Sequence, residues 1–415
     1  MFNVCIVTRS LIILNWQKIK SYHVNQICRK FISKMAANSV RVMSYNIMHK
    51  LEGSRLQKFK YCAPSALSYK SRLGRIAETI KSNSADVVCL QEVDEDAFGA
   101  LAASLRGDFT PVISLRNSEL ASRDGCAIFM RDGCKFDVVD TAAFRLRDSI
   151  PKFCPQALGR GPVSPSSSSS SSPPPSSDGR GVSTFASALW RELQEKLTMA
   201  VSVVLQPKNR SENVKSDANP PLVVSSTHLF WNPIYPDLKL LQAFLLARET
   251  AEIASKFGER IPQIIAGDFN SVPREPPSVH HQAEDGSSSF SSAVYELLST
   301  GFCSTEHPQH PMQLRKANAV FSGVSAEEMP VFEVQKLRSA MKERLGAEPP
   351  FTNFTSQFQG CLDYLWYNDF LDVTDVAPLP KEDELRKYTA LPSVLHPSDH
   401  LPLCATFALG GGRQN

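Results

Sequence analysis

Short polar motifs recur along this chain, and most of them directly follow apolar, strand-like runs. They supply carboxylates, amides and two imidazoles from widely separated segments. In chain order they are Ser44-Tyr45-Asn46, Gln91-Glu92-Val93, Ser226-Thr227-His228, Gly267-Asp268-Phe269-Asn270, Leu362-Asp363-Tyr364, Ser398-Asp399 and His400. A phosphodiester resists hydrolysis because the attacking and leaving oxygens both carry charge beside an anionic phosphate, and a divalent metal ion neutralises that charge and activates water. Together the motifs indicate a metal-dependent phosphodiesterase.

Two acidic motifs could hold the metal ion or its water. Glu92 ends an apolar run and is the first candidate for a magnesium ligand, because Mg²⁺ prefers oxygen donors. In Gly267-Asp268-Phe269-Asn270 the glycine allows a turn directly after a strand, which places Asp268 and Asn270 at the same edge. An acid there can hold metal or water, and an amide can contact phosphate without adding charge. Each motif alone also fits an ordinary turn or strand end, as does Asn46.

Two histidines could complete the chemistry. His228 follows an apolar strand and could donate to a phosphate oxygen as negative charge builds on it. A single histidine at a strand end is usually structural. However, Asp399-His400 adds a second imidazole beside an acid, which suits proton chemistry or stabilisation of an oxyanion. Asp363 could orient His400 through the other ring nitrogen.

Alternating apolar runs and amphipathic stretches must position these residues. The predicted strands are Val40–Ile47, Asp86–Gln91, Gly125–Met130, Lys135–Val139, Met199–Gln206, Leu222–Thr227, Ile261–Ala266, Cys361–Tyr367 and Leu401–Phe407. The predicted helices are Tyr69–Lys81, Asp94–Leu105, Thr184–Leu197 and the amphipathic Pro236–Phe257. Arg131-Asp132-Gly133 predicts a hairpin between the third and fourth strands. This order favours a two-layered β-sandwich flanked by helices over a single parallel sheet.

The composition predicts one catalytic domain, residues 39–410, between two tails. Residues 1–38 carry six basic and no acidic residues, which predicts a mitochondrial transit peptide and a matrix location. A disordered basic tail is the alternative, and Met35 could start a cytoplasmic form. The Ser/Pro-rich segment 159–181 and a polar segment at about 275–292 predict disordered inserts, and 411–415 a short tail.

The charge and cysteine content limit the classes of partner. Without the basic start the remaining chain has a net charge of −3, so nucleic-acid binding would need a local basic groove. The ten cysteines show no pairing pattern, which predicts no disulfide partner and a reducing compartment. No apolar stretch approaches the roughly 20 residues of a membrane helix, so no membrane association is expected.

The motifs resemble those of the endonuclease/exonuclease/phosphatase superfamily over about residues 40–408. Within it, residues 227–233, 351–353 and 358–364 are similar to the deadenylase and nocturnin group. Tyr61-Cys62-Ala63-Pro64, residues 360–364, Leu391-Pro392-Ser393 and residues 396–400 resemble its mitochondrial 2′,5′-phosphodiesterase members. Residues 124–129 are closer to the general deadenylase pattern, which leaves the linkage preference open.

This resemblance implies an α/β fold of the α+β type, in which two packed mixed β-sheets and outer helices form a four-layer sandwich with one site at the shared edge. It implies magnesium, with manganese as a possible substitute, held by Glu92 with Asn46 and Asp399 nearby. It further implies that Asp268 positions the attacking water and that Asn270 holds the scissile phosphate. His228 and His400 are then expected to stabilise the transition state, with Asp363 orienting His400. Finally, the resemblance implies that Pro233 and Phe358 hold the terminal base.

The resulting prediction is a magnesium-dependent 3′-exoribonuclease that releases AMP from poly(A) tails, from 2′,5′-oligoadenylate, or from both. RNA or oligoadenylate is thus the expected partner. No recruitment repeats are recognisable, and no protein partner is predicted. The alternatives are a nocturnin-type 2′-phosphatase acting on a nucleotide cofactor and a catalytically silent RNA-binding module. A DNA-repair nuclease of the same superfamily is disfavoured by the Thr227–Pro233 and Phe351-Thr352-Asn353 signatures.

Overall fold

The computed structural model describes most of the predicted catalytic domain. It covers residues 39–51, 54–116, 124–157, 188–208, 220–275, 289–317 and 329–410. The basic segment 1–38, the Ser/Pro-rich insert 159–181 and the tail 411–415 lie outside the described residues. Targeting to mitochondria and disorder of the first insert therefore stay predictions.

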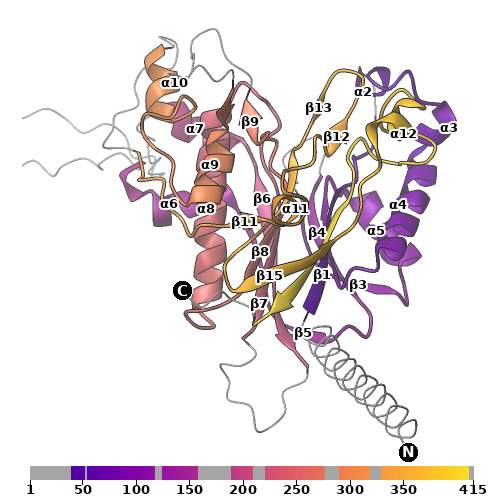
Figure 1. Ribbon diagram of the computed structural model, residues 1–415, viewed down its shortest axis with the longest axis horizontal. Helices are drawn as coiled ribbons and strands as arrows, with labels where there is room; N and C mark the ends of the chain where they lie inside the picture. The colour runs from indigo at the N-terminus through magenta and orange to yellow at the C-terminus, as the bar shows by residue number, and fades with distance from the viewer. Residues whose placement is uncertain are drawn as a thin grey trace, which may run out of the picture.

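Two six-stranded mixed sheets form the centre of the molecule (Figure 1). The first has the order β15 (Leu371–Val376), β16 (Leu403–Leu409), β1 (Ser39–Asn46), β2 (Val87–Gln91), β4 (Gly125–Arg131) and β3 (Phe109–Arg116). The second has the order β11 (Arg338–Ser339), β14 (Asp363–Tyr367), β8 (Gln263–Asp268), β7 (Leu222–His228), β6 (Met199–Pro207) and β5 (Phe136–Arg145). In each sheet one central pair is parallel, β1 with β2 and β7 with β8.

The sheets pack face to face through one continuous apolar layer. Val42 and Ile128 of the first sheet belong to the same buried cluster as Val224 and Leu365 of the second. Removing these side chains from water is the main force that holds the two sheets together. Because the strands that supply this layer are buried on both faces, their sequences are nearly continuous apolar runs.

Helices cover the outer face of each sheet and complete four layers (Figure 1). α4 (Tyr69–Asn83) and α5 (Glu95–Ser104) pack on the first sheet. α8 (Pro236–Ser255), α9 (Ala293–Thr300) and α7 (Ala188–Glu195) pack on the second. The predicted four-layer α/β sandwich is thus confirmed.

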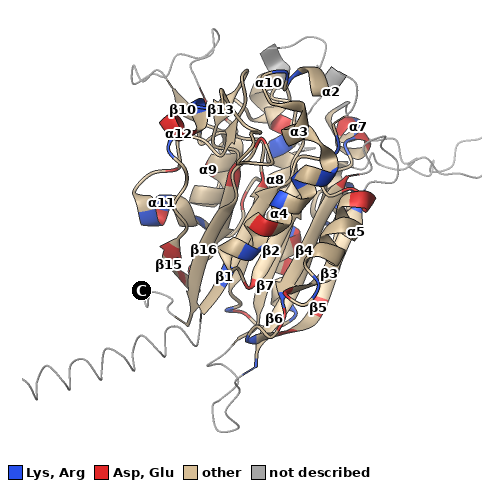
Figure 2. Cartoon of the chain, turned by 90° about the vertical axis from the view of Figure 1, so that its right-hand side faces the viewer, with Lys and Arg blue, Asp and Glu red and all other residues tan. Residues whose placement is uncertain are grey.

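The sequence of α4 explains its position. Leu73, Ile76, Ala77 and Ile80 are buried at helical spacing against the first sheet. The helix ends at Asn83, and its C-cap residue Ser84 adopts the left-handed conformation at φ 54°. Figure 2 shows both basic and acidic residues on the exposed face of α4, so this face is not a uniformly basic surface.

Short elements complete the described chain. They are α2 (Ser54–Gln57), α3 (Pro64–Leu67), η1 (Leu146–Ser149), α6 (Ile150–Phe153), η2 (Pro155–Ala157), β9 (Arg274–Glu275), β10 (Phe290–Ser291), α10 (Pro311–Ala317), α11 (Ala340–Leu345), β12 (Asn353–Phe354), β13 (Gln359–Gly360) and α12 (Glu382–Arg386). Of these, the β12–β13 ribbon matters most for the site, because it carries Phe358 in its turn.

The predicted hairpin between residues 125–130 and 135–139 is wrong. β4 pairs with β2 and β3 in the first sheet, whereas β5 pairs with β6 in the second. The segment after Arg131 carries the chain from one sheet to the other. Its turn-forming residues are those expected in a hairpin, and turn chemistry does not reveal which sheet the next strand joins.

The edges of the second predicted insert are also ordered, contrary to prediction. Glu275 pairs with Phe290, and Arg274 with Ser291, in an antiparallel ribbon. Residues 276–288 lie outside the described residues. A two-residue strand with a polar sequence carries no periodicity, so the pattern could not predict this pairing.

The helix at 236–255 is far more buried than an amphipathic surface helix. Its buried residues include the polar side chains of Asp237, Lys239, Gln242 and Thr250, because the helix packs on β7 and β8 and also contacts α7 and α9. Lys239 and Gln242 then form specific hydrogen bonds, to the Asn270 carbonyl oxygen and to Thr198 Oγ1 respectively.

None of the helices in the described part of the chain is both long and apolar enough to cross a bilayer. The cysteines of this part are free and buried.

Candidate active site

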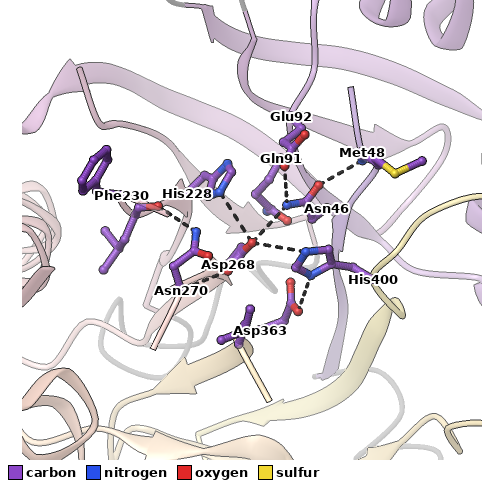
Figure 3. A network of polar contacts seen from close by, with 12 residues as sticks. Asn46, Met48, Gln91, Glu92, His228, Phe230, Asp268, Asn270, Asp363 and His400 are labelled. Carbon is purple, nitrogen blue, oxygen red and sulfur yellow. Dashed lines mark hydrogen bonds and ion pairs between the residues drawn. The ribbon is translucent and has the colours of Figure 1, made fainter. Parts of the chain in front are cut away.

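The ends of four central strands and the start of a fifth meet at one edge of the sandwich. Asn46 ends β1 and is in register with Gln91 at the end of the parallel strand β2. His228 ends β7 and is in register with Asp268 at the end of the parallel strand β8. Asp363 begins β14 opposite Asp268, because that pair is antiparallel. The strand-end motifs of the sequence therefore come together in space (Figure 3).

Glu92 lies one residue beyond β2 in a left-handed conformation, with φ 57°. Non-glycine residues seldom adopt this conformation, and the surrounding structure must hold it. Asn46 Nδ2 donates to Glu92 Oε1 at 3.2 Å, and the backbone N–H of His49 donates to Oε2 at 3.0 Å. His49 Nδ1 also contacts Oε2. The carboxylate is thus fixed toward the centre of the site.

Asp268 is the centre of the network and is 1% exposed. Its Oδ2 accepts from Asn46 Nδ2 at 3.0 Å and lies 3.5 Å from His228 Nε2 and 3.6 Å from His400 Nε2. Its Oδ1 accepts the backbone N–H of Asn270 at 2.9 Å. One carboxylate therefore contacts an amide and faces both imidazoles (Figure 3).

Gly267 allows β8 to approach β7 closely before the Asp268 turn. Its φ is 155°, and a Cβ at this position would lie 2.1 Å from the carbonyl oxygen of Thr227. Only glycine fits this approach without moving the neighbouring strand. The glycine thereby sets the distance between His228 and Asp268, which end the two strands.

His400 is held by a buried carboxylate from behind. Its Nδ1 lies 2.8 Å from Asp363 Oδ2, which also accepts from Thr352 Oγ1 at 2.6 Å. Burial alone would lower the pKa of His400, but the carboxylates of Asp363 and Asp268 raise it well above the usual value. The raised pKa favours the protonated ring, whose Nε2 faces Asp268, and a protonated imidazole can stabilise an oxyanion.

Lys239 supports the turn that carries Asn270. It is 4% exposed, and its Nζ donates to the Asn270 carbonyl oxygen at 2.6 Å. Asn270 has φ 47°, and its Nδ2 donates to the Leu229 carbonyl oxygen at 2.9 Å. Burial lowers the pKa of Lys239 to about 8, although Glu275 and Asp268 oppose this shift.

A cleft of about 520 Å³ opens over this network. Of the predicted residues it is lined by Glu92, His228, Pro233, Asp268, Asn270, Phe358, Asp399 and His400. Asn46 and Asp363 do not line it but contact residues that do, Asn46 with Glu92 and Asp268, and Asp363 with His400. The structure thus brings all predicted site residues into one site.

Phe358 is presented to the cleft by the β12–β13 turn. Its backbone N–H donates to Thr355 Oγ1 at 3.0 Å, and its ring lies over Gly360, where a Cβ would be 2.7 Å from Cζ. The side chain nevertheless remains 41% exposed. An aromatic ring fixed from below and open above can stack on a planar ligand.

The donor set of the site suits a divalent cation. Carboxylates of Glu92, Asp268 and Asp399 share the cleft, and Asp363 Oδ1 is buried without a hydrogen-bond partner. Within the described residues, Asp268, Asp363 and His400 also have ligand atoms within 4.8 Å of one another, so this buried group could hold a metal ion. Because His400 Nδ1 is engaged by Asp363, the oxygen donors of Glu92 and Asp399 suit Mg²⁺ better than this trio does.

The orientation of Asn46 refines its expected role. Its Oδ1 accepts the backbone N–H of Met48 at 3.0 Å, while its Nδ2 donates to both Glu92 and Asp268. In this orientation the amide aligns the two carboxylates instead of presenting its oxygen to a cation.

Four supporting residues were not identified from the sequence as functional. They are Lys239, His49, Thr352 and Arg72. Arg72 is 1% exposed and donates to the carbonyl oxygens of Ile47 and Pro397, which ties the segment after β1 to the segment before Asp399. Lys239 and Arg72 lie on helices, where a charged residue gives no signal of burial. Thr352 belongs to the Phe351-Thr352-Asn353 signature, and that membership was the one sequence feature that could have pointed to a role for it.

The fold and the site together define a class of metal-dependent hydrolases that act on phosphate esters. The model of the Endonuclease/Exonuclease/phosphatase family matches residues 43–400. The chain belongs to this family.

Relatives of known name agree with this assignment. Human 2′,5′-phosphodiesterase 12 is 28% identical over 378 residues, which cover 88% of this chain and 51% of that protein. The CCR4-Not complex 3′-5′-exoribonuclease subunit Ccr4 of Aspergillus oryzae is 27% identical over 406 residues, covering 91% and 48%. The chain thus spans about half the length of the curated relatives it matches.

Solved structures support the fold. ANGEL2, a 2′,3′-cyclic phosphatase crystallised with adenosine-2′,3′-vanadate, has a TM-score of 0.62 and 25% identity, covering 90% of this chain and 96% of that chain. The human nocturnin catalytic domain has a TM-score of 0.51 at 20% identity, covering 90% and 94%, and therefore bears on the fold alone.

Proposed function

We propose that this chain is a magnesium-dependent phosphodiesterase that removes adenylates from the free end of RNA tails, from 2′,5′-oligoadenylate, or from both, and releases AMP. The observation that carries the proposal is the meeting of Glu92, Asp268 and two imidazoles in a cleft that also contains Pro233 and Phe358. The names of the relatives support an oligonucleotide substrate.

Glu92 and Asp399 would hold Mg²⁺, with Mn²⁺ as a possible substitute, and Asn46 would align the carboxylates. When bound, the cation supplies charge neutralisation at the phosphate and a more acidic water. A hard, oxygen-rich donor set is what magnesium prefers.

Asp268 would orient the attacking water and accept its proton, because its Oδ2 is the point on which the network converges. His400, whose protonated form Asp363 favours, would stabilise the charge that develops on the phosphate, and His228 would donate from the other side. Asn270 gives one amide proton to the Leu229 carbonyl oxygen and retains a second for the scissile phosphate.

The terminal adenine would lie between Pro233 and Phe358. Base–aromatic stacking contributes roughly 1–3 kcal/mol per base. The exposed, supported ring of Phe358 matches this role, and the complex of ANGEL2 with adenosine-2′,3′-vanadate supports a substrate that contains adenosine.

The test is turnover of a substrate panel by the purified chain with Mg²⁺. End-labelled 3′,5′-oligoadenylate, 2′,5′-oligoadenylate and oligouridylate are compared with NADP and with RNA that ends in a 2′,3′-cyclic phosphate. Stepwise AMP release, faster from adenylate than from uridylate, is expected. Turnover of NADP or of the cyclic end alone would replace the proposal with a phosphatase, and the absence of any turnover would favour a silent binding module.

A further inference from the structure

The loop between β7 and α8 exposes two large apolar side chains near the cleft. Trp231 is 67% exposed and Ile234 is 76% exposed. Of these two, Trp231 lines the cleft together with Pro233, Phe358 and Lys58, whereas Ile234 does not. An indole left in water at the rim of a binding cleft is a surface that gains from covering by a ligand.

Hydrogen bonds fix the loop backbone on both sides of Trp231. The backbone N–H of Leu229 donates to the Asp268 carbonyl oxygen at 2.9 Å, and that of Phe230 donates to Gln242 Oε1 at 3.0 Å. On the other side, Asn232 Oδ1 accepts the backbone N–H of Ile234 at 3.0 Å.

The ring next to Trp231 is anchored as well. Phe230 packs edge-on against Tyr235, with ring centroids 5.7 Å apart, and contacts Trp231 at 6.0 Å. The backbone of Trp231 and the ring beside it are therefore fixed before a ligand binds, which lowers the entropy cost of covering the indole.

We propose that Trp231 forms a second base-binding subsite, in which the indole stacks on the base of the nucleotide next to the terminal one. This inference rests on the proposed function and narrows its substrate to an oligonucleotide. Only Asn232 separates Trp231 from Pro233, so the two Cα atoms are at most about 7 Å apart. A base adjoining the terminal nucleotide can thus reach Trp231 without leaving the cleft.

The chemistry of the subsite indicates which bases it can bind. An indole stacks on any base, so this position adds affinity without selecting adenine. Lys58 is exposed and lines the same cleft, where its ammonium can approach the backbone phosphate of the same strand. Selection of adenine is left to the terminal position at Pro233 and Phe358.

The experiment compares two oligonucleotides with the full chain. One is tetraadenylate, and the other is the same oligomer with an abasic residue next to its free end. In the wild-type protein kcat/KM is expected to be about tenfold higher for the intact oligomer, and Trp231→Ala should remove most of that difference. Ile234→Ala, an equally exposed apolar change on the same loop, should keep it.

A binding measurement separates this inference from the proposed function. With metal chelated, the intact oligomer should quench the fluorescence of the wild-type chain more than the abasic oligomer does, and Trp231→Phe should lack that extra quenching. Equal effects of both oligomers on the fluorescence, or an equal loss of kcat/KM for both in Trp231→Ala, would overturn the second subsite. Extra quenching by the intact oligomer, together with no AMP release when Mg²⁺ is supplied, would leave the subsite standing and refute the phosphodiesterase. If Trp231→Ala lowered only the turnover of NADP, the indole would instead bind a dinucleotide.

Discussion

Replacing Asp363 with asparagine removes the charge behind His400 and keeps the shape of the side chain. Asp363 is 1% exposed, and its Oδ2 lies 2.8 Å from His400 Nδ1 and 2.6 Å from Thr352 Oγ1. Asparagine retains an oxygen that can accept both hydrogen bonds. The substitution therefore tests the charge of Asp363 more than its geometry.

The distance sets the size of the effect. Two unit charges about 2.8 Å apart interact by about 6 kcal/mol at an effective dielectric constant of about 20. Desolvation offsets part of this, and removing one partner of a buried pair costs about 3–5 kcal/mol in practice. If His400 must be cationic in the transition state, kcat should fall by about 10²–10⁴-fold, because each 1.36 kcal/mol is a factor of ten. KM should change by less than about threefold, since the lost interaction is specific to the transition state.

The assay is saturating AMP release from tetraadenylate by Asp363→Asn, with thermal unfolding as the check on folding. Thr352→Val is the matched control, because it keeps the carboxylate and removes the hydrogen bonds of Thr352 Oγ1 to Asp363 Oδ2 and to the backbone N–H groups of Leu362 and Asp363. Its expected loss of kcat is about tenfold. A folded Asp363→Asn enzyme with kcat within about threefold of wild type would refute the assigned role of the Asp363–His400 pair.

Three further changes test the framework of the site. Gly267→Ala should lower the free energy of unfolding by about 3 kcal/mol in urea denaturation, because its Cβ would lie 2.1 Å from the carbonyl oxygen of Thr227. The control Gly74→Ala should not destabilise the protein, because a Cβ there would have no other atom within 4 Å. Equal effects of the two substitutions on stability would contradict the close approach of β8 to β7. Lys239→Met should lower kcat about tenfold or more while the protein stays folded, because the Asn270 carbonyl loses its donor, and an unchanged kcat would show that the contact is only structural. His310 has its pKa lowered from 6.5 to about 4 by burial and by a neighbouring histidine, so the unfolded chain binds more protons between these pH values. The free energy of unfolding should therefore fall by up to about 3 kcal/mol as the pH drops through that window, and an undiminished slope in His310→Gln would refute the assignment.

The strands that carry the site could be predicted because they lie at the centre of the sandwich. β1, β2, β7 and β8 are buried along nearly their whole length, so their sequences are apolar runs that end where the site begins. The candidate catalytic side chains at the strand ends are polar residues that interrupt such runs. This is why Glu92, His228 and Asp268 could be recognised as candidates before their positions were known.

Edge strands and supporting residues were harder to predict for a physical reason. β15 has partly exposed polar positions, and β3 contains Pro111 and a bulge between Pro111 and Ile113, so neither carries a clear period-2 pattern. From the sequence alone, Lys239 resembles any exposed lysine on a helix, and its burial becomes clear only once the packing of α8 is known. The importance of such residues arises from tertiary packing, which local sequence does not record.

We propose that this cleft hydrolyses oligoadenylate with a cation held at Glu92. The most direct test is AMP release from 3′,5′- and 2′,5′-tetraadenylate as a function of Mg²⁺ concentration, for the wild-type chain and for Glu92→Gln. Release by the wild type that requires Mg²⁺, together with a loss of at least about a hundredfold in Glu92→Gln even at high Mg²⁺, is the predicted result. Metal-independent release, or a Glu92→Gln variant as active as the wild type, would contradict the account.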